Sequence, residues 1–333
     1  MYRLLRRPSS ALCAIVPSAL LVLPSSQRRE KTECQEWSIH YKNEREFEQK
    51  LHRTIKGGVS NLRCVADFDF TLTKFSLNGK RGCSCHKIIE DCGLLDKSYH
   101  QKAQELQHIY YPLEILPGLS KETRTKYMVD WVTHAHRLLI RSGLSKETIE
   151  KAVENGVEEG RIRLRKGVLE TMDFFNRNEI PMVIFSAGIA DVLEWVIHVE
   201  SGASSMDVSK ENLCVVSNKC VFDENNVLID FEEPIFHVFN KNGSSILQKN
   251  KSYFDKWKFF EKKNMILIGD SLGDLSMSKG LLNVQNDCII AIGFLNDRTD
   301  RLDEYLRHYD VVIIGDPEFD VVHELIFQHF LLN

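Results

Sequence analysis

A short apolar run that leads into two aspartates, two residues apart, is the strongest indication of fold in this sequence. The run closes at Ala66; Asp67, Phe68 and Asp69 follow it, with threonines at positions 71 and 73. Because side chains two apart on an extended strand share a face, we expect both carboxylates to crowd one small site. Two neighbouring anions repel, so the pair requires a cation or a shared proton. The pattern therefore indicates a carboxylate nucleophile beside a general acid/base, bridged by a metal.

Polar residues also follow two later apolar segments of strand length. Residues 181–185 lead into Ser186, Ala187 and Gly188, and residues 265–269 lead into an Asp-Ser-Leu-Gly-Asp turn. In chain order, the polar residues of this set are Asp67, Asp69, Ser186, Lys241, Asp270 and Asp274. Because ligands bind outside the carboxyl ends of the strands in parallel α/β sheets, we expect these residues to converge on one crevice.

Each of these residues also has an explanation that requires no function. The two aspartates could end a strand in a polar turn, and Lys241 could be a solvated surface charge. Ser186 could cap the helix that follows it, a role compatible with phosphate binding because a helix N-terminus favours anions. Asp274 could likewise be a helix N-cap. The presence of all four sets in one chain favours the catalytic interpretation.

These motifs resemble those of the haloacid-dehalogenase superfamily of phosphoryl-transfer enzymes. They are most similar to the cytosolic 5′-nucleotidase III family, the pyrimidine 5′-nucleotidases and their 7-methylguanosine-phosphate-specific relatives. The similarity runs from about Glu44 to the C-terminus. The stretches that carry it are residues 67–81, 185–193, 237–243, 269–275 and 292–297. The resemblance implies Mg²⁺-dependent hydrolysis of nucleoside 5′-monophosphates, such as CMP, UMP or 7-methyl-GMP, through an aspartyl-phosphate.

The resemblance also implies a role for each carboxylate. Asp67 is expected to attack phosphorus. Asp69 is expected to protonate the leaving nucleoside and then to deprotonate the attacking water. Mg²⁺, a hard cation that prefers carboxylate and water oxygens, is expected on Asp67, Asp270 and the main-chain carbonyl of Asp69. Asp274 is expected to support Lys241 or a metal-bound water.

Phosphate binding is assigned by the resemblance to residues outside the first motif. Lys241 is expected to supply a fixed positive charge. Ser186 and the amides of Ala187 and Gly188 are expected to donate hydrogen bonds to phosphate oxygens. A nucleoside monophosphate is therefore the expected small-molecule partner.

Base recognition is assigned to the segment between the first and second motifs. Glu114 matches a base-recognising glutamate, since an acid near aromatic rings can accept from an exocyclic amine while a ring stacks on the base. Trp131 also matches a residue of the helical lid that members of the family carry over the active site. The chain departs from the family at Val132, where a second aromatic residue is expected, and at Ala135, where some members carry serine. These departures favour pyrimidine monophosphates but leave 7-methyl-GMP open.

The patterns predict an α/β fold, a Rossmann-like parallel sheet forming the haloacid-dehalogenase core, with an inserted all-helical cap. We expect an N-terminal extension over residues 1–43, the core over 44–83 and 166–333, and the cap over 84–165. A lid of this kind excludes water and supplies specificity. The predicted helices are residues 44–56, 97–109, 121–142, 145–159, 166–178 and 189–199. The predicted strands are residues 62–68, 181–185, 213–216, 265–269, 289–293 and 311–314, with a hairpin over 220–222 and 227–231.

Composition limits the class of protein. With 333 residues, 43% of them apolar and 27% charged, the chain can form one large domain with a sizeable insertion. A net charge of −4 argues against a nucleic-acid-binding surface. Nine scattered cysteines imply no disulfide framework and indicate a reducing compartment. Residues 83–86 (Cys-Ser-Cys-His) resemble part of a metal site, but no second pair lies at ligand spacing, so ordinary thiols are favoured. We expect a monomer.

The first thirty residues differ from the rest in charge. Arginines flank the apolar residues 11–24, Pro17 interrupts that run, and no acid precedes Glu30. The run is too short and too broken for a stable membrane span. It resembles a secretory h-region or a mitochondrial presequence. We expect a cytoplasmic protein, with organelle targeting or an endoplasmic-reticulum tether through residues 1–30 as the alternative.

Two other functions compete with a nucleotidase. One is a phosphatase for another small monoester such as phosphoserine, because the core motifs do not select a substrate. The other is a catalytically silent nucleotide-binding protein, although such relatives usually lose an aspartate and all four are present here. The resemblance further implies a possible nucleoside phosphotransferase side activity.

Overall fold

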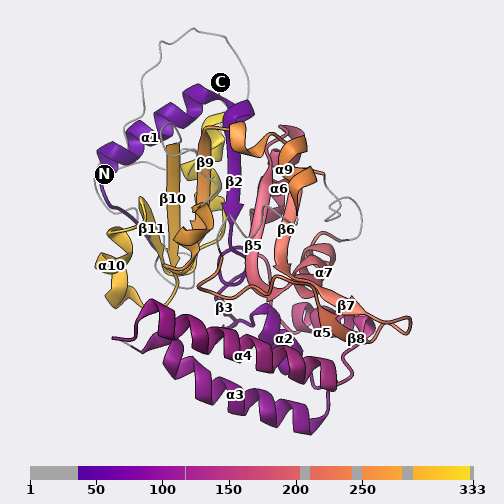
Figure 1. Ribbon diagram of the computed structural model, residues 1–333. Coiled ribbons are helices and arrows are strands. Elements are labelled where there is room, and N and C mark those ends of the chain that lie inside the picture. Colours follow the sequence, from indigo (N-terminus) through magenta and orange to yellow (C-terminus); the bar gives the residue numbers. More distant parts are fainter. Residues whose placement is uncertain (1–36, 117, 203–210, 242–249, 280–287, 331–333) are drawn as a thin grey trace.

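A seven-stranded sheet organises the protein (Figure 1). The computed structural model describes residues 37–116, 118–202, 211–241, 250–279 and 288–330. In spatial order the strands are β1 (Ser38–Tyr41), β11 (Val311–Ile314), β10 (Cys288–Leu295), β9 (Asn264–Gly269), β2 (Leu62–Ala66), β5 (Met182–Ile189) and β6 (Leu213–Asn218). Every neighbouring pair is parallel except β1 with β11. The strand that precedes the paired aspartates, β2, therefore lies in the interior of the sheet.

The sheet is covered on both faces, which explains why its central strands are apolar without alternation. Successive residues of β2 contribute to two separate apolar cores: Cys64 and Ala66 to the first, and Val65 to the second. Helices α1 (Glu44–Gly57), α6 (Val168–Arg177), α7 (Ala190–Glu200) and α11 (Asp320–Leu325) contribute to the first core, which also continues into the helices of residues 84–165. The helices that supply the second core are α9 (Lys251–Lys256) and α10 (Leu302–Leu306).

The predicted Rossmann-like α/β architecture is confirmed, and the predicted strands and helices lie close to the observed bounds. Some boundaries are wrong. β5 runs to Ile189, four residues beyond the predicted end, and the helix that begins at Lys97 runs to Ile115 and not to residue 109. The prediction extended β2 to Phe68, but the strand ends at Ala66. Both aspartates therefore lie in the loop that follows the strand. The prediction also missed β1 and the short hairpin of β3 (Ser76–Leu77) and β4 (Lys80–Arg81), because segments of two to four residues carry little periodic signal.

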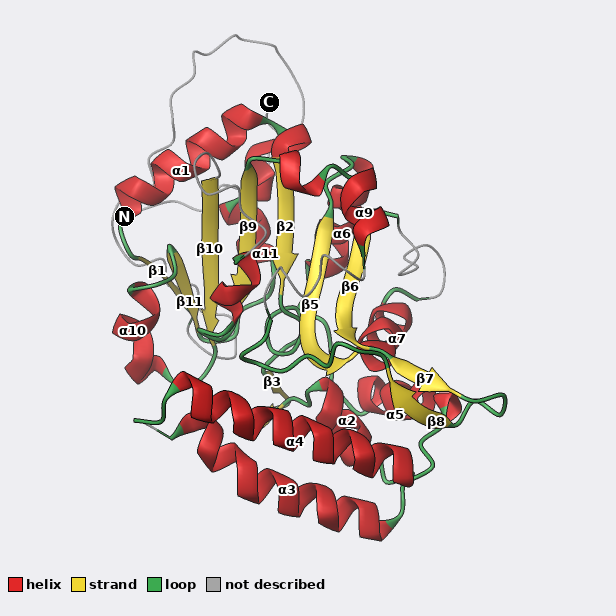
Figure 2. Ribbon diagram, in the orientation of Figure 1, coloured by secondary structure: helices red, strands yellow, loops and turns green. Residues whose placement is uncertain are grey.

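The elements within residues 84–165 are helices: α2 (Cys85–Glu90), α3 (Lys97–Ile115), α4 (Lys121–Arg141) and α5 (Lys146–Glu158). Three begin at a serine N-cap, whose hydroxyl accepts from the main-chain N–H three residues later. In Figure 2, α3 and α4 run side by side beyond the carboxyl ends of the parallel strands. Their position suits the predicted lid.

The predicted hairpin forms as β7 (Cys220–Phe222) and β8 (Leu228–Phe231), and it packs against the helices of residues 84–165. The main-chain N–H of Lys146 donates to the carbonyl of Asn226 at 2.9 Å, and that of Leu228 donates to the carbonyl of Leu144 at 2.8 Å. The ring of His136 on α4 stacks on Phe231 with 3.8 Å between centroids. Two separate chain segments thus form this part of the molecule, and the domain boundaries at residues 84 and 165 stay a prediction.

The predicted extension, with its targeting segment at residues 1–30, lies outside the described residues up to position 36. Among the helices that the structure describes, none has the length and apolar character needed to cross a membrane.

Candidate active site

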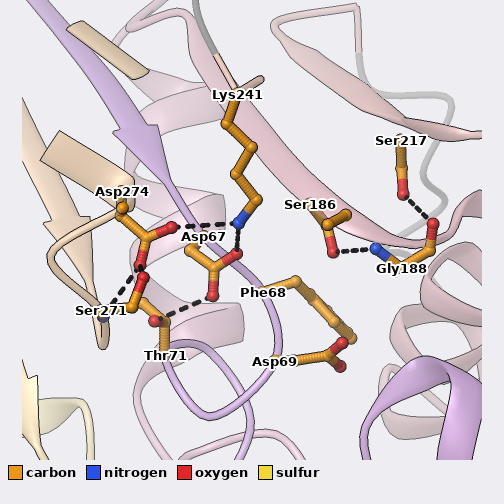
Figure 3. Close-up of polar contacts among 12 residues, drawn as sticks. Asp67, Phe68, Asp69, Thr71, Ser186, Gly188, Ser217, Lys241, Ser271 and Asp274 are labelled. Atoms are coloured by element: carbon orange, nitrogen blue, oxygen red, sulfur yellow. Dashed lines mark hydrogen bonds and ion pairs between the residues drawn. The ribbon is translucent and has the colours of Figure 1, made fainter. Parts of the chain in front are cut away.

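The expected polar residues meet beyond the carboxyl ends of three neighbouring strands, β9, β2 and β5 (Figure 3). Asp67 follows β2, Asp270 follows β9, and Ser186 lies in the C-terminal part of β5. Parallel strands bring their carboxyl ends to one edge of the sheet, so residues far apart in sequence come together here. The structure therefore brings Asp67, Asp270 and Ser186 to one edge of the sheet, as the sequence predicted.

Lys241 lies at the centre of the site. Its Nζ contacts Asp67 Oδ1 and donates to Asp274 Oδ1 at 3.0 Å, and the side chain is buried. Burial lowers the pKa of Lys241, but the carboxylates of Asp274 and Asp67 outweigh that effect and raise it. The alternative interpretation of Lys241 as a solvated surface charge is wrong.

Hydrogen bonds from Ser271 fix the Asp274 carboxylate that accepts from Lys241. Its Oδ2 accepts from the main-chain N–H of Ser271 at 2.9 Å and from the Ser271 hydroxyl at 2.8 Å. Asp274 begins a short 3₁₀ segment, Asp274–Ser278, whose N-cap is Gly273. A Cβ on Gly269 would lie 2.5 Å from the Cβ of Asp274, so only glycine allows this approach. The N-cap alternative for Asp274 is wrong, and the expected support of Lys241 agrees with the contact.

Three carboxylates share the site. Asp67, Asp270 and Asp274 each offer an oxygen, and these oxygens all lie within 4.8 Å of one another. Burial, followed by the nearby charges of Asp67 and Asp274, raises the pKa of Asp270 well above its ordinary value. Asp67 and Asp274 are buried and Asp270 is partly exposed, and among the described residues Lys241 contacts only the first two, so one lysine does not balance the three carboxylates. A small divalent cation with oxygen ligands fits this donor set, which is the chemistry expected for Mg²⁺.

Asp69 differs from the expectation that both aspartates crowd one small site. Because β2 ends before them, the strand argument does not apply, and in Figure 3 the carboxylate of Asp69 points away from Lys241. Its Oδ1 accepts from the main-chain N–H of Cys85 at 2.9 Å. Phe70, which follows, adopts a left-handed φ of 63°. The two carboxylates therefore face different surroundings, Asp67 toward the lysine and Asp69 toward α2.

The C-terminal part of β5 forms a bulge between Phe185 and Ile189. The main-chain N–H of Gly188 donates to Ser186 Oγ at 2.9 Å, and the Gly188 carbonyl accepts from the Ser217 hydroxyl at 2.8 Å. The N-cap of α7 is Ile189, so the prediction that Ser186 could cap this helix is wrong. The Gly188 amide, expected to bind phosphate, is occupied by Ser186 in this structure.

Sequence reasoning missed several residues that support the site. The Thr71 hydroxyl donates to Asp67 Oδ2 at 3.2 Å. The Asn218 amide donates to the carbonyls of Ala187, at 2.9 Å, and Phe236, at 3.0 Å, and so connects the Ser186 bulge to the segment that carries Lys241. Thr71 was visible as the threonine two residues after Asp69. Nothing in the sequence around Asn218 indicates that it supports the site.

The two base-pocket candidates lie on the helices beyond the sheet. Glu114 is on α3, where burial raises its pKa and the positive charges of Arg124 and Arg81 oppose that rise. The guanidinium of Arg124 lies 5.8 Å from the ring centroid of Phe239, two residues before Lys241. Trp131 is on α4, and its ring stacks on Tyr110 of α3 with 6.1 Å between centroids.

Comparisons with known proteins agree on one family. The family model described as pyrimidine 5′-nucleotidase (UMPH-1) matches residues 70–330. The 7-methylguanosine phosphate-specific 5′-nucleotidase A of Xenopus laevis is 38% identical over 281 residues, which cover 84% of this chain and 91% of that protein. The Homo sapiens enzyme named 7-methylguanosine phosphate-specific 5′-nucleotidase is 38% identical over 277 residues, covering 83% and 87%. A crystal structure of cytosolic 5′-nucleotidase IIIB bound to cytidine has a TM-score of 0.73 at 26% identity and covers 89% of this chain and 95% of its own.

Proposed function

Because the chain belongs to the pyrimidine 5′-nucleotidase family, we propose that it hydrolyses nucleoside 5′-monophosphates to nucleoside and phosphate through an aspartyl-phosphate on Asp67. The observation that carries the proposal is the buried contact of Lys241 with Asp67 and Asp274, within a cluster of three carboxylates. Phosphoryl transfer requires positioning and neutralisation of charge more than covalent help. A buried lysine beside a carboxylate nucleophile provides both.

The reaction divides into two balanced halves. In the first, a carboxylate oxygen of Asp67 attacks phosphorus, the bond between phosphorus and O5′ breaks, and the proton of Asp69 passes to O5′. In the second, water attacks phosphorus and gives a proton to Asp69, and the bond between phosphorus and Asp67 breaks. Inorganic phosphate leaves, and both aspartates return to their starting states. Ser186 and the amide of Ala187 would hold phosphate oxygens.

Asp67 and Asp270, with the main-chain carbonyl of Asp69, would hold Mg²⁺, and Asp274 would support Lys241. When bound, Mg²⁺ supplies positive charge that offsets the phosphate oxygens. We expect activity to be lost on chelation and restored by Mg²⁺, whereas Ca²⁺, which tolerates irregular and higher coordination, should inhibit. Phosphate release from CMP, measured with chelator and then with each added cation, tests this. Full turnover in excess chelator would contradict the metal assignment.

The substrate class depends on the base pocket. We propose that Glu114 accepts from an N–H of the base, the exocyclic amine of CMP or 7-methyl-GMP or the ring N–H of UMP, and that Trp131 stacks on the base. The family description names pyrimidine nucleotidases, and two relatives are named for 7-methylguanosine phosphate. Because Val132 stands where a second aromatic residue is expected, we place CMP and UMP first and 7-methyl-GMP second.

A panel of phosphate monoesters tests the substrate class. We expect wild-type chain to prefer CMP, UMP or 7-methyl-GMP over phosphoserine and sugar phosphates. Glu114→Gln should lower that preference by roughly one to two orders of magnitude, since a hydrogen bond to a charged group contributes about 1.5–3 kcal/mol. Trp131→Leu should show the same substrate-selective loss. Glu122→Gln, on the exposed side of α4, is the matched control and should keep the wild-type preference.

The panel also separates the competing functions. A wild-type chain that shows no preference for nucleotides would support a phosphatase for another small monoester. Tight CMP binding without turnover in saturating Mg²⁺ would support a silent nucleotide-binding protein. If both substitutions slowed every substrate equally, the result would indicate damage to the helices beyond the sheet. Base recognition would then not be assigned to Glu114 and Trp131.

Three further properties complete the proposal. The name of the similar crystal structure contains the word cytosolic, which supports a cytoplasmic location for this chain. We also propose that the protein is a monomer and that it transfers phosphate to a nucleoside hydroxyl as a side activity. In that transfer the acceptor hydroxyl replaces water in the second half of the reaction.

A further inference from the structure

The main-chain amide of Cys85 contacts the carboxylate that the proposed reaction uses as its acid. Its N–H donates to Asp69 Oδ1 at 2.9 Å. Cys85 is the first residue of α2, and the N–H groups in the first turn of a helix have no partner within it. Ser84 caps the helix by accepting from Lys87. Asp69, from a loop of the sheet, therefore satisfies a donor that the helix itself cannot satisfy.

Packing fixes the position of this amide. The Cys85 side chain is fully buried, and a Cβ built on Gly188 would lie 2.8 Å from the Cys85 Cβ. The absence of a side chain at Gly188 thus allows α2 to approach the bulge in β5. The hydroxyl of Ser217 holds the Gly188 carbonyl from the other side at 2.8 Å. Neither the helix start nor the bulge can shift alone, so the donor to Asp69 is placed by both.

We propose that Cys85 is the positioning residue for proton transfer, because its amide occupies Asp69 Oδ1 and leaves Oδ2 to carry the proton toward O5′. This inference rests on the proposed function, since it requires that Asp69 protonates the leaving nucleoside. A carboxylic acid whose one oxygen accepts a hydrogen bond carries its proton on the other. The amide therefore selects both the oxygen and the direction of the transfer. Since α2 is the first helix of residues 84–165, the geometry of the acid depends on where these helices sit.

The test removes the N–H and keeps the rest of the chain. L-lactic acid at position 85 replaces the amide by an ester of nearly the same size, and Cys85→Ala, which keeps the amide, is the reference protein. Both are assayed on CMP and on p-nitrophenyl phosphate. The nucleoside needs a proton to leave, whereas a nitrophenolate leaves without one. The kcat/KM value for each substrate reports the first half of the reaction, before water attacks. The ratio of the two values on one sample does not depend on how much of that sample is folded.

We expect the ester to lower the ratio of kcat/KM on CMP to kcat/KM on p-nitrophenyl phosphate at least about tenfold, part of the 10²–10⁴ that general acid catalysis contributes. The KM for CMP should stay within about twofold of the reference, because phosphate and base contacts are retained. An unchanged ratio, including an equal fall on both substrates, would overturn the proposal and reduce the contact to a helix cap.

A second variant tests the same proposal if the ester variant folds poorly. Cys85→Pro removes the same donor at the first helical position, where proline is tolerated, and Ser84 already has the extended backbone that precedes proline, with ψ of 171°. It should lower the same ratio, and a ratio equal to that of Cys85→Ala would again overturn the proposal. Failure of the proposed function can be told apart from failure of the Cys85 proposal. It would appear in the wild-type chain as turnover of p-nitrophenyl phosphate without turnover of CMP.

Discussion

Asp67→Asn should lower phosphate release from CMP by at least about a thousandfold, in line with the loss when a catalytic nucleophile is removed. An amide cannot attack phosphorus and form the acyl phosphate, and it removes one of three negative charges from the cluster. The fold should be retained, because Lys241 keeps its contact with Asp274 at 3.0 Å. Turnover with CMP, and unfolding in urea on the same preparation, measure the two effects separately.

A matched control tests whether the loss is specific to the site. Asp300 is an exposed aspartate that pairs with Arg298 at 2.8 Å, and its conversion to asparagine makes the same chemical change at the surface. Asp300→Asn should keep wild-type turnover. If Asp67→Asn also kept it, the nucleophile would have to be another residue. If Asp67→Asn unfolded the chain, the loss of activity would say nothing of chemistry, and trapping of a phosphorylated wild-type chain would then decide the question.

The parts of the site that follow from strand order could be predicted from the sequence. Asp67, Ser186 and Asp270 each follow an apolar segment, and parallel pairing of β2, β5 and β9 then brings them to one edge of the sheet. This requires no knowledge of loop conformation. The same pattern placed Lys241 in this set, and the family resemblance, which the comparisons confirm, added its expected role as a fixed positive charge.

The parts that depend on loop conformation could not be predicted. Asp69 turns toward Cys85 because the chain leaves β2 early and takes a left-handed conformation at Phe70, and its neighbours in space, not in sequence, stabilise that turn. The carbonyl of Phe70 accepts from Arg165 at 2.9 Å and from Asn296 at 3.0 Å. Neither residue is near Phe70 in the chain, so no local pattern indicates the turn.

The same difficulty explains the wrong assignments. Ser186 and Asp274 both precede helical sequence, so each looked like a possible N-cap, but Ser186 lies within a bulge of β5 and Asp274 faces Lys241. The hairpin at residues 220–231 was recognised from its turn residues, whereas its contact with the helices of residues 84–165 arises only in the folded chain. Periodicity identifies elements, and contacts between distant elements decide what each polar residue does.

Arg165→Met should lower the free energy of unfolding by about 3–5 kcal/mol, the cost of removing one partner from a buried ion pair. Arg165 is 1% exposed and contacts Asp316 at 2.6 Å. It also donates to the carbonyl of Thr71 at 2.9 Å and to Asn296 Oδ1 at 2.8 Å. Methionine takes the guanidinium away from the buried Asp316 carboxylate, which keeps only the main-chain N–H donors of Phe75 and Ser76 and the more distant Lys74. It also leaves the Thr71 carbonyl and Asn296 Oδ1 without their arginine donor. Urea unfolding of the variant and the wild type measures the difference.

The exposed pair of Arg177 with Asp173 is the matched control, because its 2.7 Å distance is similar and its arginine side chain is 69% exposed. Arg177→Met should cost no more than about 1 kcal/mol, since solvent screens the pair. Arg165→Met should also slow turnover of CMP, because the loop at Phe70 that directs Asp69 toward Cys85 loses a donor, while Arg177→Met should not. Equal losses of stability in the two variants would contradict a stabilising role for the buried network. A large loss of stability with wild-type turnover of the folded fraction would instead mean that Asn296 alone holds the turn at Phe70.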